Sequence, residues 1–274
     1  MKTLDIERII ARVDDLPTLP RTVLRITELV NDPKSSARDL ARIITDDQVL
    51  AVRLLKLVNS SFYGFPQRIS TITGAIVLLG FDAIRNLLLT TSVFDLFSNH
   101  KKISLIRQEQ FWDHSLGCAV AAKVIGNHLR YDKVEELFVA GLLHDIGKIA
   151  VKESILSKTG PLNKDEWAEM RQHPVVGARM IQDIPFLAPA IPIVLYHHER
   201  WDGSGYPARL IGADIPESAR IVAIVDVYDA LTHDRVHRPA LPESEALAVM
   251  GQGIGKHFDP HLMASFYSQL PEIR

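Results

Sequence analysis

Histidine and aspartate residues recur along the second half of the chain at a spacing that suits metal binding. They are His114, the pair His144-Asp145, His173, the pair His197-His198, and Asp226. Successive groups lie 24 to 30 residues apart. This is about one helix plus one loop, so successive helices of a bundle can each bring one or two ligands into a shared interior. Imidazole and carboxylate together suit iron, manganese or zinc, and the pattern therefore predicts a metal site.

The paired ligands indicate two ions. Neighbouring residues on a helix diverge by about 100°, so such a pair can grip two metals only where the helix end faces them. Asp145 has two carboxylate oxygens and is the natural bridging ligand, and Lys148 is placed to meet a phosphate oxygen. Two metals about 3.5 to 4 Å apart would polarise a phosphodiester and activate a bound water. We expect two divalent ions, iron or manganese, with zinc or nickel as alternatives.

The sequence predicts amphipathic helices as the elements that position these residues, because apolar residues recur at three- and four-residue intervals. In the first half the expected helices are 6–13, 23–30, 40–44, 49–58 and 83–97. In the second half they are 111–129, 134–148, 164–172, 175–183, 188–198, 218–232 and 243–250. No stretch alternates with period two between hairpin turns. The predicted fold is an all-α helical bundle, with the polar segment 98–104 as the boundary between two halves.

Composition narrows the class of protein. The 274 residues are 47% hydrophobic and 23% charged with a formal net charge of -2, which is typical of a globular protein and gives no broad electrostatic footprint for nucleic acid. The first residues contain no apolar signal region, and no apolar run approaches the roughly 20 residues that span a bilayer. We expect a cytoplasmic protein without membrane contact. Cys118 is the only cysteine, so neither an intramolecular disulfide nor a thiolate cage can form, and its apolar neighbours favour a buried structural thiol.

Two longer motifs give the ligands a context. The segment Ala140-Gly-Leu-Leu-His-Asp-Ile-Gly-Lys148 is followed by His197-His-Glu-Arg-Trp-Asp-Gly-Ser-Gly-Tyr-Pro207, and His173-Pro174 and Asp226-Val-Tyr-Asp-Ala-Leu231 occur in the same order. This series resembles the HD-GYP subgroup of the HD-superfamily phosphohydrolases, from about His114 to Phe266. The resemblance implies a metal-dependent phosphodiesterase whose substrate is the cyclic dinucleotide cyclic di-GMP.

The resemblance also implies residue roles. His114, His144, Asp145 and Asp226 would hold one metal, and Asp145, His173, His197 and His198 the other. Lys148 and Asp145 would act at the scissile phosphate. Arg235 and Arg238 would bind the substrate phosphates, and Tyr206 would shape the substrate edge or a partner surface. Asp229 is expected to orient a ligating histidine rather than bind metal.

The first half is similar to a different family, the HDOD signalling domain. The similarity rests on Leu16-Pro-Thr-Leu-Pro20, Asp46-Asp47 and Leu54-Leu-Lys-Leu-Val-Asn-Ser-Ser-Phe-Tyr-Gly64. It implies a regulatory region at residues 1–100 that binds signalling proteins, followed by a phosphohydrolase core at 101–274, and is compatible with a homodimer. HDOD proteins usually carry an HD bundle without metal ligands, whereas this chain keeps them.

Departures from the HD-GYP pattern leave alternatives open. Gln110 stands where members that bind a third metal have a glutamate, so a two-metal site is expected. The segment Arg235-Val-His-Arg238 replaces a more usual Arg-Pro-Tyr-Arg, which puts the substrate in question. The alternatives are a noncatalytic signalling adaptor that retains the metal site and a phosphohydrolase that acts on another nucleotide.

Overall fold

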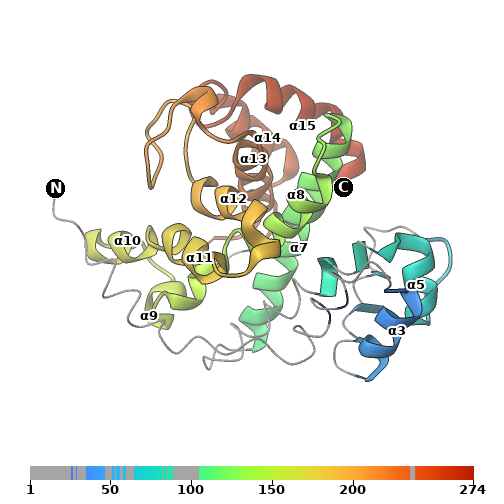
Figure 1. Ribbon diagram of the computed structural model, residues 1–274. Coiled ribbons are helices and arrows are strands. Elements are labelled where there is room, and N and C mark those ends of the chain that lie inside the picture. Colours follow the sequence, from blue (N-terminus) through green and yellow to red (C-terminus); the bar gives the residue numbers. More distant parts are fainter. Residues whose placement is uncertain are drawn as a thin grey trace. The chain divides into compact units, whose positions relative to one another are not determined.

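The chain folds as helices joined by loops and short 3-10 turns (Figure 1). The computed structural model describes residues 105–234 and 238–274 and, with several gaps, residues 26–88. No strand occurs among these residues, where Ile254 and Phe258 form an isolated bridge, and the predicted all-α class is confirmed. None of the described helices is both long and apolar enough to cross a membrane.

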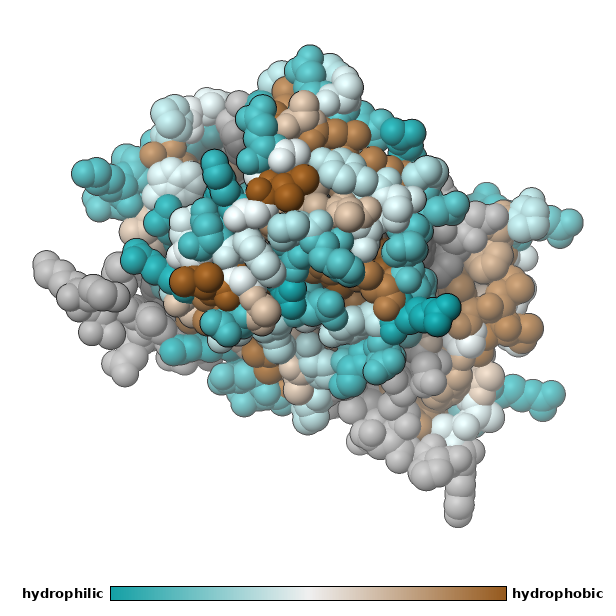
Figure 2. All heavy atoms as spheres, turned by 90° about the horizontal axis from the view of Figure 1, so that it is seen from above, coloured by the Kyte–Doolittle hydropathy of each residue, from teal (hydrophilic) through white to brown (hydrophobic). Residues whose placement is uncertain are grey.

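The backbone divides into two compact units. The first includes α3 (Ala37–Asp46) and α5 (Ile72–Leu79), which pack against each other. Thr71 caps α5, because its side chain accepts a hydrogen bond from the backbone N–H of Gly74. This unit carries apolar surface, visible as brown spheres in Figure 2, and Val77 is 77% exposed. The predicted helix 6–13 and the boundary segment 98–104 lie outside the described residues.

The second unit carries the histidine series and is organised around a long central helix. That helix, α7 (Leu105–His128), packs against α8 (Val134–Leu143), α13 (Glu217–Thr232) and α15 (Pro260–Ile273). The other α-helices are α9 (Glu153–Leu156), α10 (Lys164–Met170), α11 (His173–Ile181), α12 (Ile191–Tyr196) and α14 (Glu243–Gln252). Three 3-10 turns, η1 (Ile146–Ala150), η2 (Pro185–Ala190) and η3 (Gly212–Asp214), complete the described part of the unit.

Polar side chains set several of these helix starts. Asn163 and Glu166 form a reciprocal capping box at the start of α10. Asp259 accepts hydrogen bonds from two backbone N–H groups at the start of α15. These caps satisfy backbone N–H groups that have no partner within the helix, and so help to fix where α10 and α15 begin.

The predicted helix 134–148 is too long. The α-helix ends at Leu143, His144 is its C-cap, and the chain continues as the 3-10 turn η1. Close packing gives the physical reason, since Gly147 lies against the start of α11. A Cβ atom at Gly147 would stand 2.0 Å from the carbonyl oxygen of His173 and 2.6 Å from the nitrogen of Gly177.

Replacing Gly147 with alanine is therefore expected to destabilise the protein by roughly 2 kcal/mol, because backbone rather than a flexible side chain must move. The shift would also displace His173. Thermal unfolding of the purified variant measures the loss. Gly160→Ala is the control, because a Cβ there meets nothing within 4 Å. Equal melting temperatures for the two variants would contradict the packing argument.

Candidate metal centre

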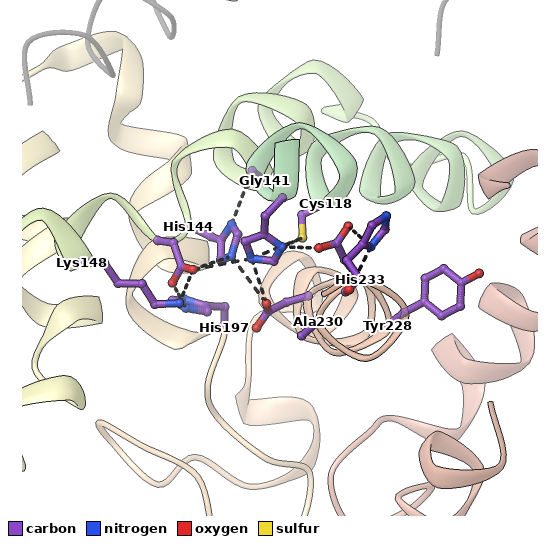
Figure 3. A network of polar contacts seen from close by, with 12 residues as sticks. Cys118, Gly141, His144, Lys148, His197, Tyr228, Ala230 and His233 are labelled. Carbon is purple, nitrogen blue, oxygen red and sulfur yellow. Dashed lines mark hydrogen bonds and ion pairs between the residues drawn. The ribbon is translucent and has the colours of Figure 1, made fainter. Parts of the chain in front are cut away.

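Five elements bring the seven predicted ligands together. His114 comes from α7, His144 and Asp145 from the junction of α8 and η1, and His173 from the first turn of α11. The end of α12 supplies His197 and His198, and α13 supplies Asp226. Both predicted ligand pairs therefore stand at the ends of helices. Figure 3 shows His144, Lys148 and His197 close together, with Cys118 projecting from α7 toward the same centre.

Asp145 lies in the middle of this cluster and turns one oxygen toward each side. Oδ1 lies 3.2 Å from Nε2 of His173 and 3.7 Å from Nε2 of His197. Oδ2 lies 3.4 Å from Nε2 of His144 and 3.6 Å from Nε2 of His114. A carboxylate in this position can bridge two cations.

The candidate ligands fall into two groups on geometric grounds. One holds His114, His144, Asp226 and Cys118, and the other holds Asp145, His173, His197 and His198. Oδ1 of Asp226 completes the first group at 3.3 Å from Nε2 of His114 and 3.8 Å from Nε2 of His144. Within each group the candidate ligand atoms lie within 4.8 Å of one another, close enough for both clusters to hold metal.

The imidazole rings are oriented by a repeated local hydrogen bond. In three of them Nδ1 donates to the carbonyl three residues earlier: His144 to Gly141 at 2.7 Å, His173 to Met170 at 2.8 Å and His197 to Val194 at 3.0 Å. A carbonyl accepts but cannot donate, so Nδ1 carries the proton of the neutral ring and Nε2 is the nitrogen that can bind a metal. Each ring therefore turns Nε2 toward the cluster.

Unsatisfied polar atoms show that the residues fit a cation. Nε2 of His144 and Oδ1 of Asp145 are buried without a hydrogen-bond partner. The Nε2 atoms of His173 and His197 lie 3.3 Å apart, although both are acceptors in the tautomer set by their carbonyl partners. Converging lone pairs in a buried site repel one another, and a positive ion between them removes that cost.

Burial and neighbouring charges shift the pKa values of the candidate ligands. Burial by itself would lower the pKa of the His144 imidazole, but the carboxylates of Asp145 and Asp226 together raise that pKa to about 10. Burial likewise opposes ionisation of Asp145, whereas Lys148 and His144 hold its pKa well below the usual value. On the other side of the cluster, burial lowers the pKa of His197 to about 4, so this imidazole stays neutral. Since His144 is protonated in the absence of a metal, a bound cation would displace that proton and leave ionised carboxylates beside neutral imidazoles, which are a donor set for a divalent ion.

Asp229 supports the first ligand from behind. Its Oδ2 accepts a hydrogen bond from Nδ1 of His114 at 2.5 Å, and its Oδ1 lies 3.2 Å from Nδ1 of His233. The contact fixes the His114 ring so that Nε2 faces the cluster. Asp229 thus contacts a candidate ligand, and its predicted orienting role stays a prediction.

Asp229→Asn is expected to weaken metal binding by about 10- to 100-fold, because the neutral amide holds the imidazole less firmly and lowers its basicity. Competition with a chelator of known affinity measures the change. His233→Ala removes the exposed neighbour of Asp229 and should change metal affinity little. An Asp229→Asn protein that binds metal as tightly as His233→Ala would rule out the orienting role.

One side of the cluster is open to solvent. His114, His144, Asp145, His173 and His197 are buried. Asp226, His198, Lys148 and Tyr206 are only partly buried. Lys148 pairs with Oδ2 of Asp145, and the Tyr206 ring stacks on His198 with 4.9 Å between centroids. These partly buried side chains mark the side from which a substrate can enter.

The structure describes only one of the two arginines that were predicted to bind phosphate. Arg235 lies outside the described residues. Arg238 is half-buried, and its guanidinium donates to the carbonyls of Ala230 and Leu231 near the end of α13. It stabilises that helix end, and its contact with a phosphate stays a prediction. Gln110, where a third metal would need a carboxylate, is exposed near the start of α7.

Two residues of the site were missed by sequence reasoning. Cys118 follows His114 by one helical turn, and its Sγ lies 3.6 Å from Nδ1 and 4.0 Å from Nε2 of that ring. Glu199 is 2% exposed and accepts hydrogen bonds from the backbone N–H groups of Ala208, Arg209 and Leu210. The four-residue spacing from His114 was a usable signal for Cys118. No spacing rule points to Glu199, because its partners are backbone groups of a loop.

Comparison with known families assigns the chain to one of them. The HDOD domain family matches residues 16–177, which is more than half of the chain. The chain belongs to the HDOD family. The match extends well past residue 100, where the sequence motifs alone had ended it, and it includes His114, the His144-Asp145 pair and His173. The boundary at residue 100 stays a prediction.

Individual relatives add detail to the family assignment. An HDOD domain protein of unknown function from Geobacter sulfurreducens is 26% identical, with 98% of this chain and 94% of that one covered and a TM-score of 0.62. A cyclic di-GMP phosphodiesterase of Vibrio cholerae is 44% identical over 140 residues, which is 48% of this HDOD protein and 28% of the relative. A 3'3'-cGAMP-specific phosphodiesterase of the same organism is 42% identical over 126 residues, or 45% and 24% of the two chains. The HDOD protein thus spans only about a quarter of the length of these two enzymes.

Proposed function

We propose that this HDOD protein is a metal-dependent phosphodiesterase that hydrolyses cyclic di-GMP in a signal-transduction system, and that its second half is an HD-GYP-like core. The observation that carries the proposal is Asp145, whose two oxygens face two separate groups of imidazole Nε2 atoms. A single structural ion would need only one such group. Two adjacent cations bridged by a carboxylate are typical of sites that hydrolyse phosphate esters.

The proposed ligands of the first ion are His114, His144, Asp145 and Asp226, and those of the second are Asp145, His173, His197 and His198. Iron or manganese fits this nitrogen and oxygen set, with zinc or nickel as alternatives. When bound, the pair of ions supplies charge neutralisation for the phosphate and a water of lowered pKa.

The protein's own side chains orient and hold the substrate. The Lys148 ammonium pairs with Asp145 and is partly exposed, so it can reach a phosphate oxygen on the open side. The Tyr206 ring, stacked on His198, forms a wall at that opening. Hydrolysis adds water across one P–O bond, and the cyclic dinucleotide opens to the linear form.

The relatives support the reaction class more strongly than the base specificity. Several matching enzymes are named cyclic di-GMP phosphodiesterases, at 39% to 44% identity. Others are named 3'3'-cGAMP-specific phosphodiesterases, at 32% to 42% identity. If the substrate is not cyclic di-GMP, the relatives named 3'3'-cGAMP-specific phosphodiesterases favour another cyclic dinucleotide as the alternative.

Noncatalytic signalling is the second candidate function, and membership of the HDOD family favours it. Exposed Val52, Val77 and Leu78 in the first unit provide apolar surface for a signalling partner. Substituting His144 and Asp145 separates the two functions. Loss of signalling with partner binding and fold intact supports catalysis, whereas unchanged signalling supports an adaptor.

Turnover by the purified chain is the direct test of the proposal. The protein is loaded anaerobically with Fe(II) or Mn(II), its metal content is measured, and cyclic di-GMP and 3'3'-cGAMP are supplied separately. We expect the linear dinucleotide from cyclic di-GMP and less product from 3'3'-cGAMP. Absence of hydrolysis with both metal positions filled would overturn the proposal.

A further inference from the structure

Arg171 occupies a distinctive place beside the open side of the cluster. It is exposed at the C-cap of α10, two residues before His173. Its guanidinium carbon lies 5.3 Å from the centroid of the Tyr206 ring and 5.6 Å from that of the Trp167 ring. Contacts of this kind with two rings restrain a long side chain that would otherwise sample many rotamers.

The donors of this guanidinium are available to a ligand. Within the described part of the chain, no carboxylate pairs with it and no carbonyl accepts its N–H groups. A guanidinium presents its donors around its edge as a planar fork, which matches the oxygens of a phosphate. Arg171 is therefore held in place by two rings while its hydrogen-bonding capacity remains unused.

The Tyr206 ring links Arg171 to the metal centre. Tyr206 stacks on His198, and Arg171 in turn lies over Tyr206. The segment that carries Arg171 also contacts the start of α9, because Nζ of Lys152 pairs with Oε2 of Glu169 in α10 at 2.6 Å. Arg171 thus lies one ring beyond a proposed ligand, near the reacting centre but separated from it.

A cyclic dinucleotide carries two phosphodiesters, of which a binuclear centre and Lys148 engage one. We propose that Arg171, held by Trp167 and Tyr206, binds the second phosphate, the one that is not cleaved. The inference rests on the proposed function and makes Arg171 a determinant of substrate class, selecting cyclic dinucleotides over simple phosphodiesters. A positive charge placed for the second phosphate does not distinguish the bases, so it serves any cyclic dinucleotide.

Kinetics of the metal-loaded full chain with two substrates test this role. For Arg171→Ala we expect the KM for cyclic di-GMP to rise about tenfold or more, as for a lost charge-assisted hydrogen bond. The KM for bis(p-nitrophenyl) phosphate, which has one phosphate, should change far less. Arg171→Lys keeps the charge without the planar fork and should lie between wild type and Arg171→Ala. Arg179→Ala, which removes an exposed arginine in the last turn of α11, is the matched control.

The outcomes separate this inference from the proposed function. An unchanged KM for cyclic di-GMP, or equal rises for both substrates, would overturn the role of Arg171. Weaker binding of cyclic di-GMP that is not shared by cyclic di-AMP, measured as an inhibitor, would also overturn it, because Arg171 would then read the base. If the wild-type chain with both metals hydrolyses neither substrate, the proposed function itself fails.

Discussion

Asp145→Asn is expected to abolish binuclear metal binding and to lower the turnover of cyclic di-GMP by at least about 10³-fold. Asparagine has nearly the same shape as aspartate, but its amide nitrogen cannot ligate a cation and its charge is zero. Since the two carboxylate oxygens face different histidine groups and the amide keeps only one oxygen, the substitution removes a ligand from one ion and the bridging negative charge from both. Loss of metal catalysis costs several kcal/mol of transition-state stabilisation, and each 1.36 kcal/mol is about tenfold in rate.

Elemental analysis and turnover are measured together on the same preparation. We expect wild type to retain two ions per chain and Asp145→Asn to retain fewer than one. Asp183→Asn removes an exposed carboxylate beyond α11 and should match wild type in both measurements. Thermal unfolding of the metal-free proteins checks that the Asp145→Asn fold is intact. Two tightly held ions in Asp145→Asn would disprove the bridging role.

Glu199→Ala is expected to destabilise the protein by about 3 kcal/mol and to loosen the loop that carries Tyr206. The Glu199 carboxylate accepts three backbone hydrogen bonds from residues 208–210, at 2.6, 2.9 and 3.1 Å. Alanine leaves these donors without their acceptor, and hydrogen bonds to charged groups contribute about 1.5 to 3 kcal/mol each. Solvent reaches the exposed residues Ala208 and Arg209, so the expected loss is smaller than the sum of three such bonds.

Chemical unfolding of metal-loaded protein measures the stability, and the KM for cyclic di-GMP reports on the loop. Glu272→Ala, an exposed glutamate near the end of α15, is the control and should stay within about 0.5 kcal/mol of wild type. Glu199→Gln should rescue the loop only in part, because its amide oxygen can accept from Ala208 and Arg209 while its NH₂ group then faces the N–H of Leu210. A Glu199→Ala protein with wild-type stability and KM would contradict the role assigned to this carboxylate.

Sequence pattern was a good guide to the helices and a poor guide to their ends. Helix α13 begins one residue before its predicted start and ends at Thr232, as expected. By contrast, the predicted helix 134–148 breaks at Leu143, because Gly147 must approach the backbone of α11. The apolar period reports which face is buried. It contains no information about which distant backbone lies against that face.

The candidate site, too, was predictable in its residue types and spacing but not in its tertiary contacts. The sequence by itself determined the all-α class and a series of histidines and aspartates spaced by one helix and one loop, because ligand type and periodicity are local properties. Only the tertiary structure decided that Asp145 turns one oxygen to each histidine group, that Glu199 ties down a loop, and that Arg171 rests on Tyr206. Each of these contacts joins segments that meet only when the helices pack. Their geometry depends on side-chain rotamers and interhelical distances, which residue spacing along the chain does not specify.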